Sequence, residues 1–297
     1  MRVLLIGAGG YVGSVVAERL TAEGHEVVAL ARPGSTRPAV PFERRFGDLK
    51  VPASLSAAVT DDIDGVIHAG TPTGDARMDA AAVTALTAPM HGTIRPFVYT
   101  SGVWVLGAAG QQSAGQQSAD ETSPTDPIPI VGYRPAVEDQ VLARTDHGIR
   151  ATVLRPGIVH GRGGGVPALL VEWARKAGVP RVVGTLDVRW PMVHVEDLAD
   201  LYVKVLTQAP ARTVWHGIAE PAVKVRDLAA AAGRVAGVSG DVQVWPADEA
   251  AQDLGQQFTE ALALDQSVTA EHARTRLEWQ PRQLDAVSDL RVGSYRS

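Results

Sequence analysis

The chain has 297 residues, of which 45% are hydrophobic and 21% charged, with a formal net charge of -5 and no cysteine. This balance is typical of a globular protein with one large α/β unit or two domains that share a core. The small negative charge argues against nucleic acid as a partner. The lack of cysteine excludes disulfides, thiolate nucleophiles and cysteine-ligated metals. Without an 18-residue uncharged span or a signal-like start, we expect a cytoplasmic protein with no membrane partner.

Apolar runs of strand length alternate with helix-length segments in the first half of the chain. The strand patterns are Val3–Ile6, Val27–Leu30, Gly65–Ala69, Pro96–Thr100 and Ala151–Leu154. This alternation predicts an α/β fold, a doubly wound parallel sheet of the Rossmann type. The alternation weakens after Gly161. We therefore predict a dinucleotide-binding domain over residues 1–160, completed by about 188–215, and a smaller C-terminal α/β substrate domain over 161–187 and 216–297.

Three glycines, Gly7, Gly10 and Gly13, are spaced by two residues each between the first strand and the first helix. A side chain at Gly7 or Gly10 would obstruct the tight turn and the approach of a pyrophosphate to the helix N-terminus, where free N–H groups favour an anion. The strand–loop–helix context gives the motif its predictive value. We expect Gly7, Gly10, Tyr11, Val12 and Gly13 to contact a dinucleotide.

The second strand ends without a carboxylate. Rossmann domains that prefer NAD place an acidic residue here, which binds the adenosine ribose. In this chain Arg32 follows Ala31, and a guanidinium group can hold a 2′-phosphate bidentately. We therefore predict NADP(H) rather than NAD(H) as the cofactor. The alternative is that Arg32 is a solvated charge at the end of a strand.

Later segments, together with the glycine spacing, resemble the extended branch of the short-chain dehydrogenase/reductase superfamily, the epimerase/dehydratase-like proteins. The matching segments are Gly47–Leu49, His68–Gly70, Phe97–Gly102, Leu154–Gly161 and Val193–Ala199. The resemblance implies further cofactor contacts at Asp48, Leu49, Ala69, Gly70, Thr71, Thr100, Arg134, Pro156, Gly157 and Ile158. Homodimers are common in this branch, so the resemblance also implies a homodimer as an expectation.

The chain departs from the superfamily at the catalytic centre. The superfamily uses a Tyr-x-x-x-Lys pair, in which the lysine lowers the pKa of the tyrosine and the tyrosine transfers a proton. If Glu138 matches the glutamate that usually follows this motif, Ile130 stands at the tyrosine position and Arg134 at the lysine position. If Tyr133 is the tyrosine instead, Val137 stands at the lysine position. Neither alignment restores the pair.

Three residues are the candidates for proton transfer: Ser101, Tyr133 and His160. Ser101, or Thr100 before it, could donate a hydrogen bond to a substrate oxygen, although many relatives place the serine one residue later, where this chain has Gly102. His160 lies in a glycine-rich loop near the expected nicotinamide and could act as a general acid. A structural role is the alternative for each of them.

Trp104, Arg162 and Trp190 could line a pocket for a small organic substrate, with simple packing as the alternative for each. The eight histidines are scattered without the spacing of metal ligands, so we expect no catalytic metal. Two functions follow from these patterns. One is an NADP(H)-dependent oxidoreductase or epimerase-like enzyme that acts on a carbonyl, a hydroxyl or an imine. The other is a non-catalytic NADP(H)-binding sensor or regulatory protein, which the missing catalytic pair favours.

Overall fold

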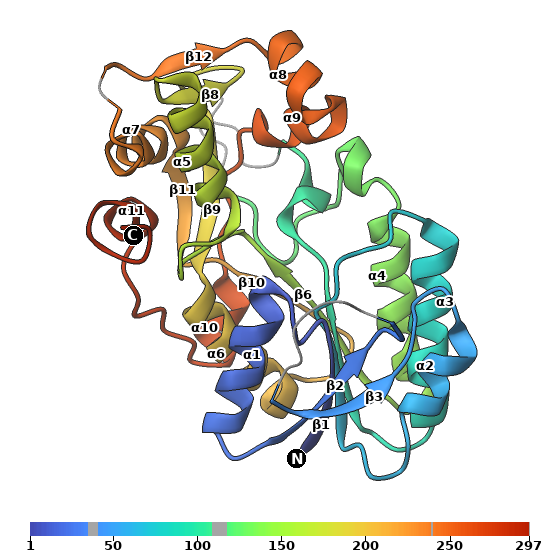
Figure 1. The fold of residues 1–297 in the computed structure, drawn as a ribbon. Helices are drawn as coiled ribbons and strands as arrows, with labels where there is room; N and C mark the ends of the chain where they lie inside the picture. The colour runs from blue at the N-terminus through green and yellow to red at the C-terminus, as the bar shows by residue number, and fades with distance from the viewer. Residues whose placement is uncertain (35–40, 109–117, 239, 297) are drawn as a thin grey trace.

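The computed structural model describes residues 1–34, 41–108, 118–238 and 240–296 (Figure 1). The strands are β1 (Arg2–Ile6), β2 (Glu26–Ala31), β3 (Glu43–Phe46), β4 (Gly65–His68), β5 (Pro96–Thr100), β6 (Arg150–Pro156), β7 (Ile158–His160), β8 (Arg181–Val183), β9 (Arg189–His194), β10 (Thr213–Gly217), β11 (Glu220–Lys224) and β12 (Gln243–Trp245). The α-helices are α1 (Tyr11–Ala22), α2 (Pro52–Ala58), α3 (Ala76–Thr87), α4 (Arg134–Ala143), α5 (Gly165–Ala177), α6 (Val195–Gln208), α7 (Val225–Ala236), α8 (Ala247–Leu254), α9 (Gln256–Leu262), α10 (Glu271–Arg276) and α11 (Ala286–Val292). Among these described helices none is long and apolar enough to cross a membrane.

The predicted Rossmann sheet is confirmed. Seven parallel strands follow the order β10-β6-β5-β4-β1-β2-β3, with helices on both faces (Figure 1). The order reverses beside β1, which pairs with β2 on one side and β4 on the other. Ile6 is in register with Leu30 of β2 and His68 of β4. The carboxyl ends of these strands are therefore level, and the crevice where open α/β sheets bind ligands opens directly after Ile6.

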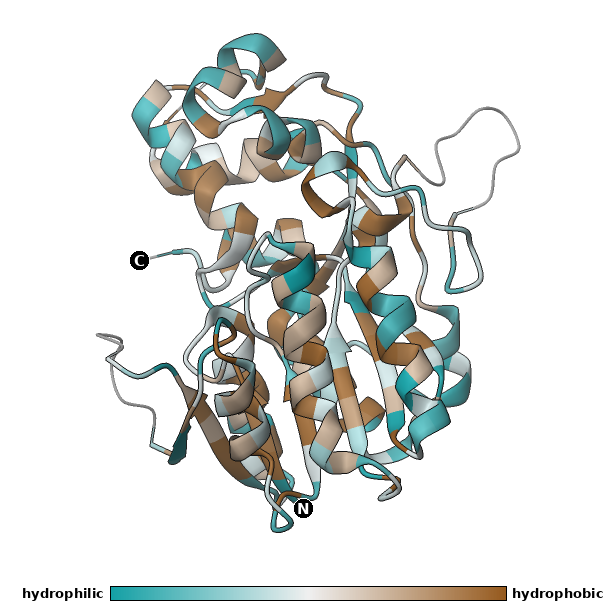
Figure 2. Ribbon diagram, turned by 90° about the vertical axis from the view of Figure 1, so that its right-hand side faces the viewer, coloured by the Kyte–Doolittle hydropathy of each residue, from teal (hydrophilic) through white to brown (hydrophobic). Residues whose placement is uncertain are grey.

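Both faces of the large sheet are buried at its central strands, which explains why β1, β4 and β5 are mostly apolar rather than alternating, whereas the edge strand β3 is polar (Figure 2). In β1, Val3 and Leu5 pack on the core that includes α1 and α6. Leu4 and Ile6 pack on the opposite core, with α2, α3 and α4. The central strands are thereby fixed from both sides, so the loops that follow them start from rigid positions.

A third core forms the smaller α/β unit. Its strands make a sheet of order β11-β9-β7 and a pair β12-β8. They share this core with α5, α7, α8, α9 and α11. The strand β10 joins the large sheet through its parallel pairing with β6. The strand β9 does not join it, because it pairs with β7 and β11 instead.

One segment of the expected smaller domain packs on the large sheet instead. We expect residues 216–297 in the smaller domain, but Val268, Ala273 and Trp279 belong to the core of the large sheet. The indole N–H of Trp279 donates to the carbonyl of Asp197 at 2.9 Å, and α10 packs against β10. This segment covers the edge strand of the sheet, which would otherwise expose Trp215.

Candidate functional site

The loop between β1 and α1 can be built only with glycine at two positions. Gly7 has a φ of +93°, and a Cβ there would lie 2.5 Å from the carbonyl oxygen of Ala69. A Cβ on Gly13 would collide with the carbonyl group of Gly7. At Gly10 a Cβ would have a single neighbour within 4 Å, the Gly7 oxygen at 3.1 Å. Packing thus requires the outer two glycines, while the middle one leaves space above the start of α1.

The N-terminus of α1 is open to a ligand. Gly10 is its N-cap residue, and no side chain caps the helix there. The first N–H groups of a helix have no partner within the helix, and together with the helix dipole they attract an anion. The start of α1 therefore has the features of a site for an anionic group.

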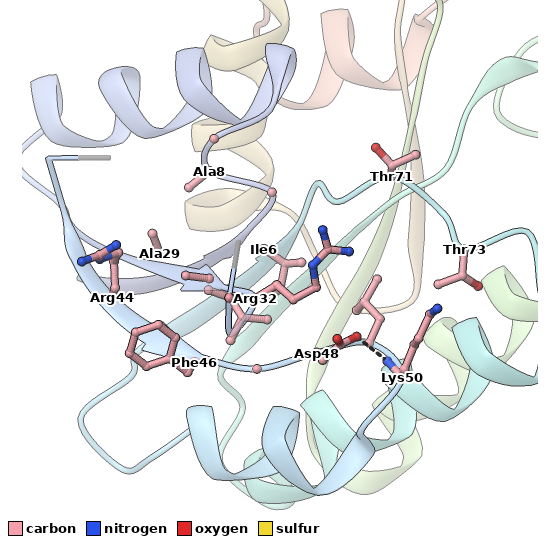
Figure 3. Close-up of a pocket in the computed structure, with 17 residues that line it drawn as sticks. Ile6, Ala8, Ala29, Arg32, Arg44, Phe46, Asp48, Lys50, Thr71 and Thr73 are labelled. Carbon is pink, nitrogen blue, oxygen red and sulfur yellow. Dashed lines mark hydrogen bonds between the residues drawn. The ribbon is translucent and has the colours of Figure 1, made fainter. Parts of the chain in front are cut away.

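A cavity of about 450 Å³ lies at the carboxyl ends of β1, β2 and β3, next to this loop (Figure 3). Five predicted cofactor residues line it: Gly7, Arg32, Asp48, Leu49 and Thr71. The structure adds four polar or aromatic residues that the sequence reasoning missed: Arg44, Phe46, Lys50 and Thr73. Arg44 and Phe46 could have been found from the strand period, because they stand two residues apart at the end of β3 and share one face.

Positive charge dominates this cavity. Among its described lining residues Arg32, Arg44 and Lys50 are cationic, and Asp48 is the one carboxylate. Asp48 is engaged locally, since its Oδ1 accepts the backbone N–H of Lys50 at 2.9 Å (Figure 3). The side chain of Phe46 is unusually open for an aromatic group, with 60% of the residue exposed. The cavity therefore combines a site for a phosphate with a flat apolar surface for a ring.

Beyond the glycine loop, the ends of β4 and β5 carry a buried polar network. Arg134 donates from Nη2 to the carbonyl of Thr100 at 2.6 Å, and its guanidinium carbon lies 6.0 Å from the centre of the Tyr99 ring. His68 meets the same ring edge-on at 5.5 Å. Burial lowers the pKa of His68 to about 4, so its imidazole is neutral.

Three buried atoms of this network have no hydrogen-bond partner within the described part of the chain: Nδ1 of His68, Oγ of Ser101 and Nε of Arg134. Buried polar atoms are nearly always paired, so each such atom calls for an ordered water or a ligand. All three lie at the ends of β4 and β5 or at the start of α4. The region therefore fits a polar ligand group better than an apolar core.

A buried ion pair fixes Glu138, the residue on which one alignment of the missing catalytic pair depends. The carboxylate of Glu138 on α4 accepts two hydrogen bonds from Arg155 of β6. Nη2 of Arg155 donates at 2.5 Å and Nε at 3.1 Å. This bidentate contact fixes Glu138 against the sheet. In the alignment that starts from Glu138, Ile130 takes the tyrosine position and Arg134 the lysine position. The approach of Arg134 to the end of β5 agrees with this alignment.

Tyr133 is held away from such a role. Its hydroxyl donates to Oδ2 of Asp79 at 2.7 Å. Burial raises the pKa of Tyr133, and the hydrogen bond to Asp79 raises it further. A catalytic tyrosine needs the opposite shift, because it must exchange its proton near neutral pH. The structure therefore favours the structural alternative for Tyr133.

His160 is also held in a structural position. The residue is 1% exposed, and its Nδ1 lies 3.1 Å from Oδ2 of Asp289 on α11. Burial alone would raise the pKa of Asp289, but hydrogen bonds from His160 and Ser294 keep it below its ordinary value. A general acid must reach the substrate, and this imidazole is enclosed by His194 at the end of β9 and Asp289 of α11. The expectation of a proton donor at His160 is corrected accordingly.

His160, His194 and Asp289 offer ligand atoms within 4.8 Å of one another, a separation that a metal ion could bridge. The hydrogen bonds favour another use. Nδ1 of His194 accepts the backbone N–H of Glu196 at 3.2 Å, so a neutral ring carries its proton on Nε2. That nitrogen faces Asp289 at 4.0 Å and, when protonated, has no lone pair for a metal. The donor set therefore fits a hydrogen-bonded cluster.

The three substrate candidates lie in different surroundings. Trp104 is partly buried between the two domains and meets Phe258 of α9 edge-to-face at 6.5 Å. Trp190 is instead buried in the core of the smaller domain, where its N–H donates to the carbonyl of Leu262 at 3.1 Å. Arg162 forms ion pairs with Glu18 and Glu196 at 2.8 and 2.5 Å. Trp190 and Arg162 therefore have structural roles, which corrects their assignment.

The residues after β6 that are predicted to contact the cofactor also have structural roles. A Cβ on Gly157 would lie 2.5 Å from the carbonyl oxygen of Pro191, so a glycine is needed where β6 passes β9. Ile158 packs in the core of the smaller domain. Its side chain is therefore part of that core. Pro156, in contrast, is the last residue of β6 and lies at the carboxyl end of the large sheet.

Comparison with known proteins agrees with this geometry. Residues 3–215 match the model of the NAD dependent epimerase/dehydratase family. The chain belongs to this family. It is 32% identical to an uncharacterized protein of Saccharomyces cerevisiae, over 98% of both chains. Family membership supports a general oxidoreductase or epimerase-like function for an NAD(P)-binding Rossmann protein.

Two solved structures of the same fold differ in the cofactor that they contain. Thermus thermophilus UDP-glucose 4-epimerase, in complex with NAD, has a TM-score of 0.79 at 20% identity and covers 100% of this chain and 98% of its own. Human epimerase family protein SDR39U1, with NADPH, has a TM-score of 0.75 at 20% identity and covers 99% of each chain. At this level of identity the likeness shows the fold alone.

Proposed function

We propose that this chain is an NADP(H)-dependent oxidoreductase or epimerase-like enzyme that acts on a carbonyl, hydroxyl or imine of a small organic substrate. The observation that carries the cofactor preference is the group of Arg32, Arg44 and Lys50 around one cavity at the ends of β2 and β3. A 2′-phosphate needs such charge-assisted donors, and an unphosphorylated ribose needs a carboxylate there. The human relative with NADPH is consistent with this choice.

The residues of both halves of the crevice fit a nicotinamide dinucleotide. The amides at the start of α1 would bind the pyrophosphate, and Phe46 would lie against the adenine. Arg134 would hold the ribose on the nicotinamide side, since it takes the place of the family lysine. The unpaired Nε of this buried residue supports the assignment. When bound, the cofactor supplies or accepts a hydride, while the protein contributes binding and orientation.

Ser101 is the residue that we propose for the substrate oxygen. Its hydroxyl lies at the end of β5 and lacks a hydrogen-bond partner within the described residues. Ile130 at the tyrosine position cannot exchange a proton. Ser101 would therefore orient the oxygen by a hydrogen bond, and a reaction that needs little proton assistance suits the site best.

A second candidate is an NADP(H)-binding protein without turnover. It is favoured by the engagement of Tyr133 with Asp79 and of His160 with Asp289, which removes both from proton transfer. Such a protein would keep the pyrophosphate cradle and the basic cavity, because these features serve binding alone.

Calorimetry with NADPH and NADH tests the cofactor assignment. We expect the wild-type chain to bind NADPH at least tenfold more tightly. Arg32→Asp should remove that preference, because the loss of one charge-assisted contact costs about 1.5–3 kcal/mol, or roughly 10- to 100-fold in Kd. Arg226→Asp makes the same charge change at an exposed site of the smaller domain and should leave both affinities unchanged. Failure to bind either dinucleotide would overturn the proposal.

Absorbance at 340 nm separates the two candidates. Purified protein is mixed with NADPH and a panel of carbonyl and imine substrates. Oxidation of NADPH that depends on substrate supports the enzyme. Tight NADPH binding with neither NADPH oxidation nor chemical conversion of any substrate in the panel supports the binding protein, since an epimerase-like enzyme would convert its substrate without a net change at 340 nm.

A further inference from the structure

The glycine-rich loop 161–165, between β7 and α5, lies directly on the residue that opens the pyrophosphate-binding helix. The hydroxyl of Tyr11 donates to the carbonyl of Gly161 at 2.7 Å. A Cβ on Gly164 would collide with the ring of Tyr11. Gly165, with a φ of +72°, adopts a conformation that favours glycine. The loop therefore lacks side chains where it covers the Tyr11 ring.

The C-terminal segment holds the same loop from its other side. The hydroxyl of Tyr295 accepts the N–H of Gly161 at 2.9 Å and donates to the carbonyl of Gly164 at 2.6 Å. Oγ of Ser294 accepts the N–H of Gly163 at 3.0 Å. Tyr295 is 6% exposed, so water does not replace these bonds freely. Two tyrosine hydroxyls, Tyr11 and Tyr295, thus meet at Gly161.

This C-terminal segment is itself fixed to the core. Oδ1 of Asp289 accepts the backbone N–H of Ser294 at 2.9 Å. Oδ2 of the same carboxylate lies 3.1 Å from Nδ1 of His160, which directly precedes the loop. The segment after α11 is therefore held in place relative to β7, and the position of Tyr295 follows from it.

We propose that Tyr295 is a positioning residue for the cofactor site. Its hydroxyl orders the loop 161–165, the loop orders the ring of Tyr11, and Tyr11 sets the first N–H groups of α1. The inference rests on the proposed function, because it assigns those N–H groups to the cofactor pyrophosphate. Tyr295 touches no ligand itself, and it lies 284 positions after Tyr11 in the sequence numbering.

Tyr295→Phe tests this role, with NADPH and 2′-AMP as the two probes. The variant leaves a buried N–H and a buried carbonyl without their partner, so the loop loses its fixed position. We expect the Kd for NADPH to rise about tenfold. The Kd for 2′-AMP should stay within about twofold, because this ligand reaches the basic cavity but has no pyrophosphate. Unequal effects on the two ligands distinguish positioning from general loss of structure.

Asp285→Ala is the matched control. Asp285 caps α11 through the N–H of Ser288 at 2.8 Å and contacts no residue of the loop 161–165 in the described structure. Loss of this cap should lower the melting temperature without changing the Kd for NADPH. If Tyr295→Phe lowers the melting temperature in the same way but binds NADPH normally, the positioning role is wrong while the proposed function stands.

A double-mutant cycle with Tyr11→Phe adds a second criterion. If both hydroxyls act through the same loop, each single variant weakens NADPH binding and the double variant is weaker by less than the product of the two effects. Independent, multiplicative effects would contradict the inference. If the wild-type chain binds neither NADPH nor 2′-AMP, the proposed function falls and the positioning role falls with it.

Discussion

The two ends of the crevice are built in opposite ways. The end that we assign to adenosine is an open cavity, in which exposed cationic side chains surround a backbone loop. The end that we assign to nicotinamide is a buried network, in which His68, Arg134 and Ser101 are fixed by packing. The first end resembles a docking surface for charge. The second depends on desolvated groups, whose energies are larger and whose geometry is less tolerant.

This contrast explains why the chain has the family's glycine motif at the adenosine end but lacks the family's tyrosine–lysine pair at the nicotinamide end. A backbone cradle needs glycine at a few positions, so its signature is local in the sequence. A catalytic centre made of side chains needs partners from several elements, and a substitution such as Ile130 changes its chemistry without changing the fold. We therefore expect binding and catalysis to be separable in this protein, and substitutions at the two ends can measure how far.

The largest effect is expected at the ion pair beneath the nicotinamide end. Glu138→Gln leaves Arg155 buried and uncompensated, which should lower the free energy of unfolding by about 3–5 kcal/mol. Glu23→Gln removes an exposed (i, i+4) pair with Arg19 and should cost less than about 0.5 kcal/mol. Urea denaturation measures both. If Glu138→Gln lowers the free energy of unfolding by less than about 1 kcal/mol, the nicotinamide end is not more desolvated than the exposed surface.

The pH dependence of stability sharpens the same distinction. Burial lowers the pKa of His68 from 6.5 to about 4. As the pH falls below 6.5, His68 is protonated in the unfolded chain but stays neutral in the folded chain. The contribution of neutral His68 to the free energy of unfolding is therefore constant above pH 6.5 and decreases between pH 6.5 and 4. The loss approaches about 3 kcal/mol. Burial lowers the pKa of His216 to about 3, which acts in the same direction.

Urea denaturation at pH 7.5 and pH 4.5 tests this expectation. His68→Gln should reduce the difference in unfolding free energy between the two pH values. His91→Gln, at an exposed histidine stacked on His147, should retain the wild-type difference. An unchanged difference in His68→Gln would show that this histidine is not kept neutral by burial.

Gly10 and Gly13 test whether the cradle can lose its ligand without losing its fold. Gly10→Ala meets only the Gly7 oxygen at 3.1 Å, so we expect a small change in melting temperature but an increase of about 30-fold in the Kd for NADPH. Gly13→Ala collides with the Gly7 carbonyl and should lower both stability and affinity. Normal NADPH affinity in Gly10→Ala would contradict our assignment of the pyrophosphate to this loop.

The smallest effect is expected at the lysine position. Arg134→Met removes the charge and keeps most of the volume, and we expect the Kd for NADPH to rise about tenfold, or 1.4 kcal/mol. Arg134→Lys restores the family residue and should recover part of that loss. The Kd for 2′-AMP serves as the internal control, because this ligand does not reach Arg134. Equal weakening of both ligands would mean that the two ends are not independent.

Some of this site was predictable because its signals are local. The strand Pro96–Thr100 has the bounds that its apolar run predicts. The glycine loop follows from the glycine spacing together with the strand before it and the helix after it. Arg44 escaped notice because its strand is short and polar, and its role depends on a cavity shared with β2.

The sequence by itself determined the Rossmann order, the glycine cradle and the absence of a carboxylate after β2, because each depends on neighbouring residues and on the periods of strand and helix. Tertiary structure alone decided the roles of Tyr133, His160 and Trp190. Their partners lie 54, 129 and 72 positions away, and no local pattern records such contacts. Residues 268–279 pack on the core of the large sheet for the same reason, because the strand β10 and the helix α6 that they contact are distant in the sequence.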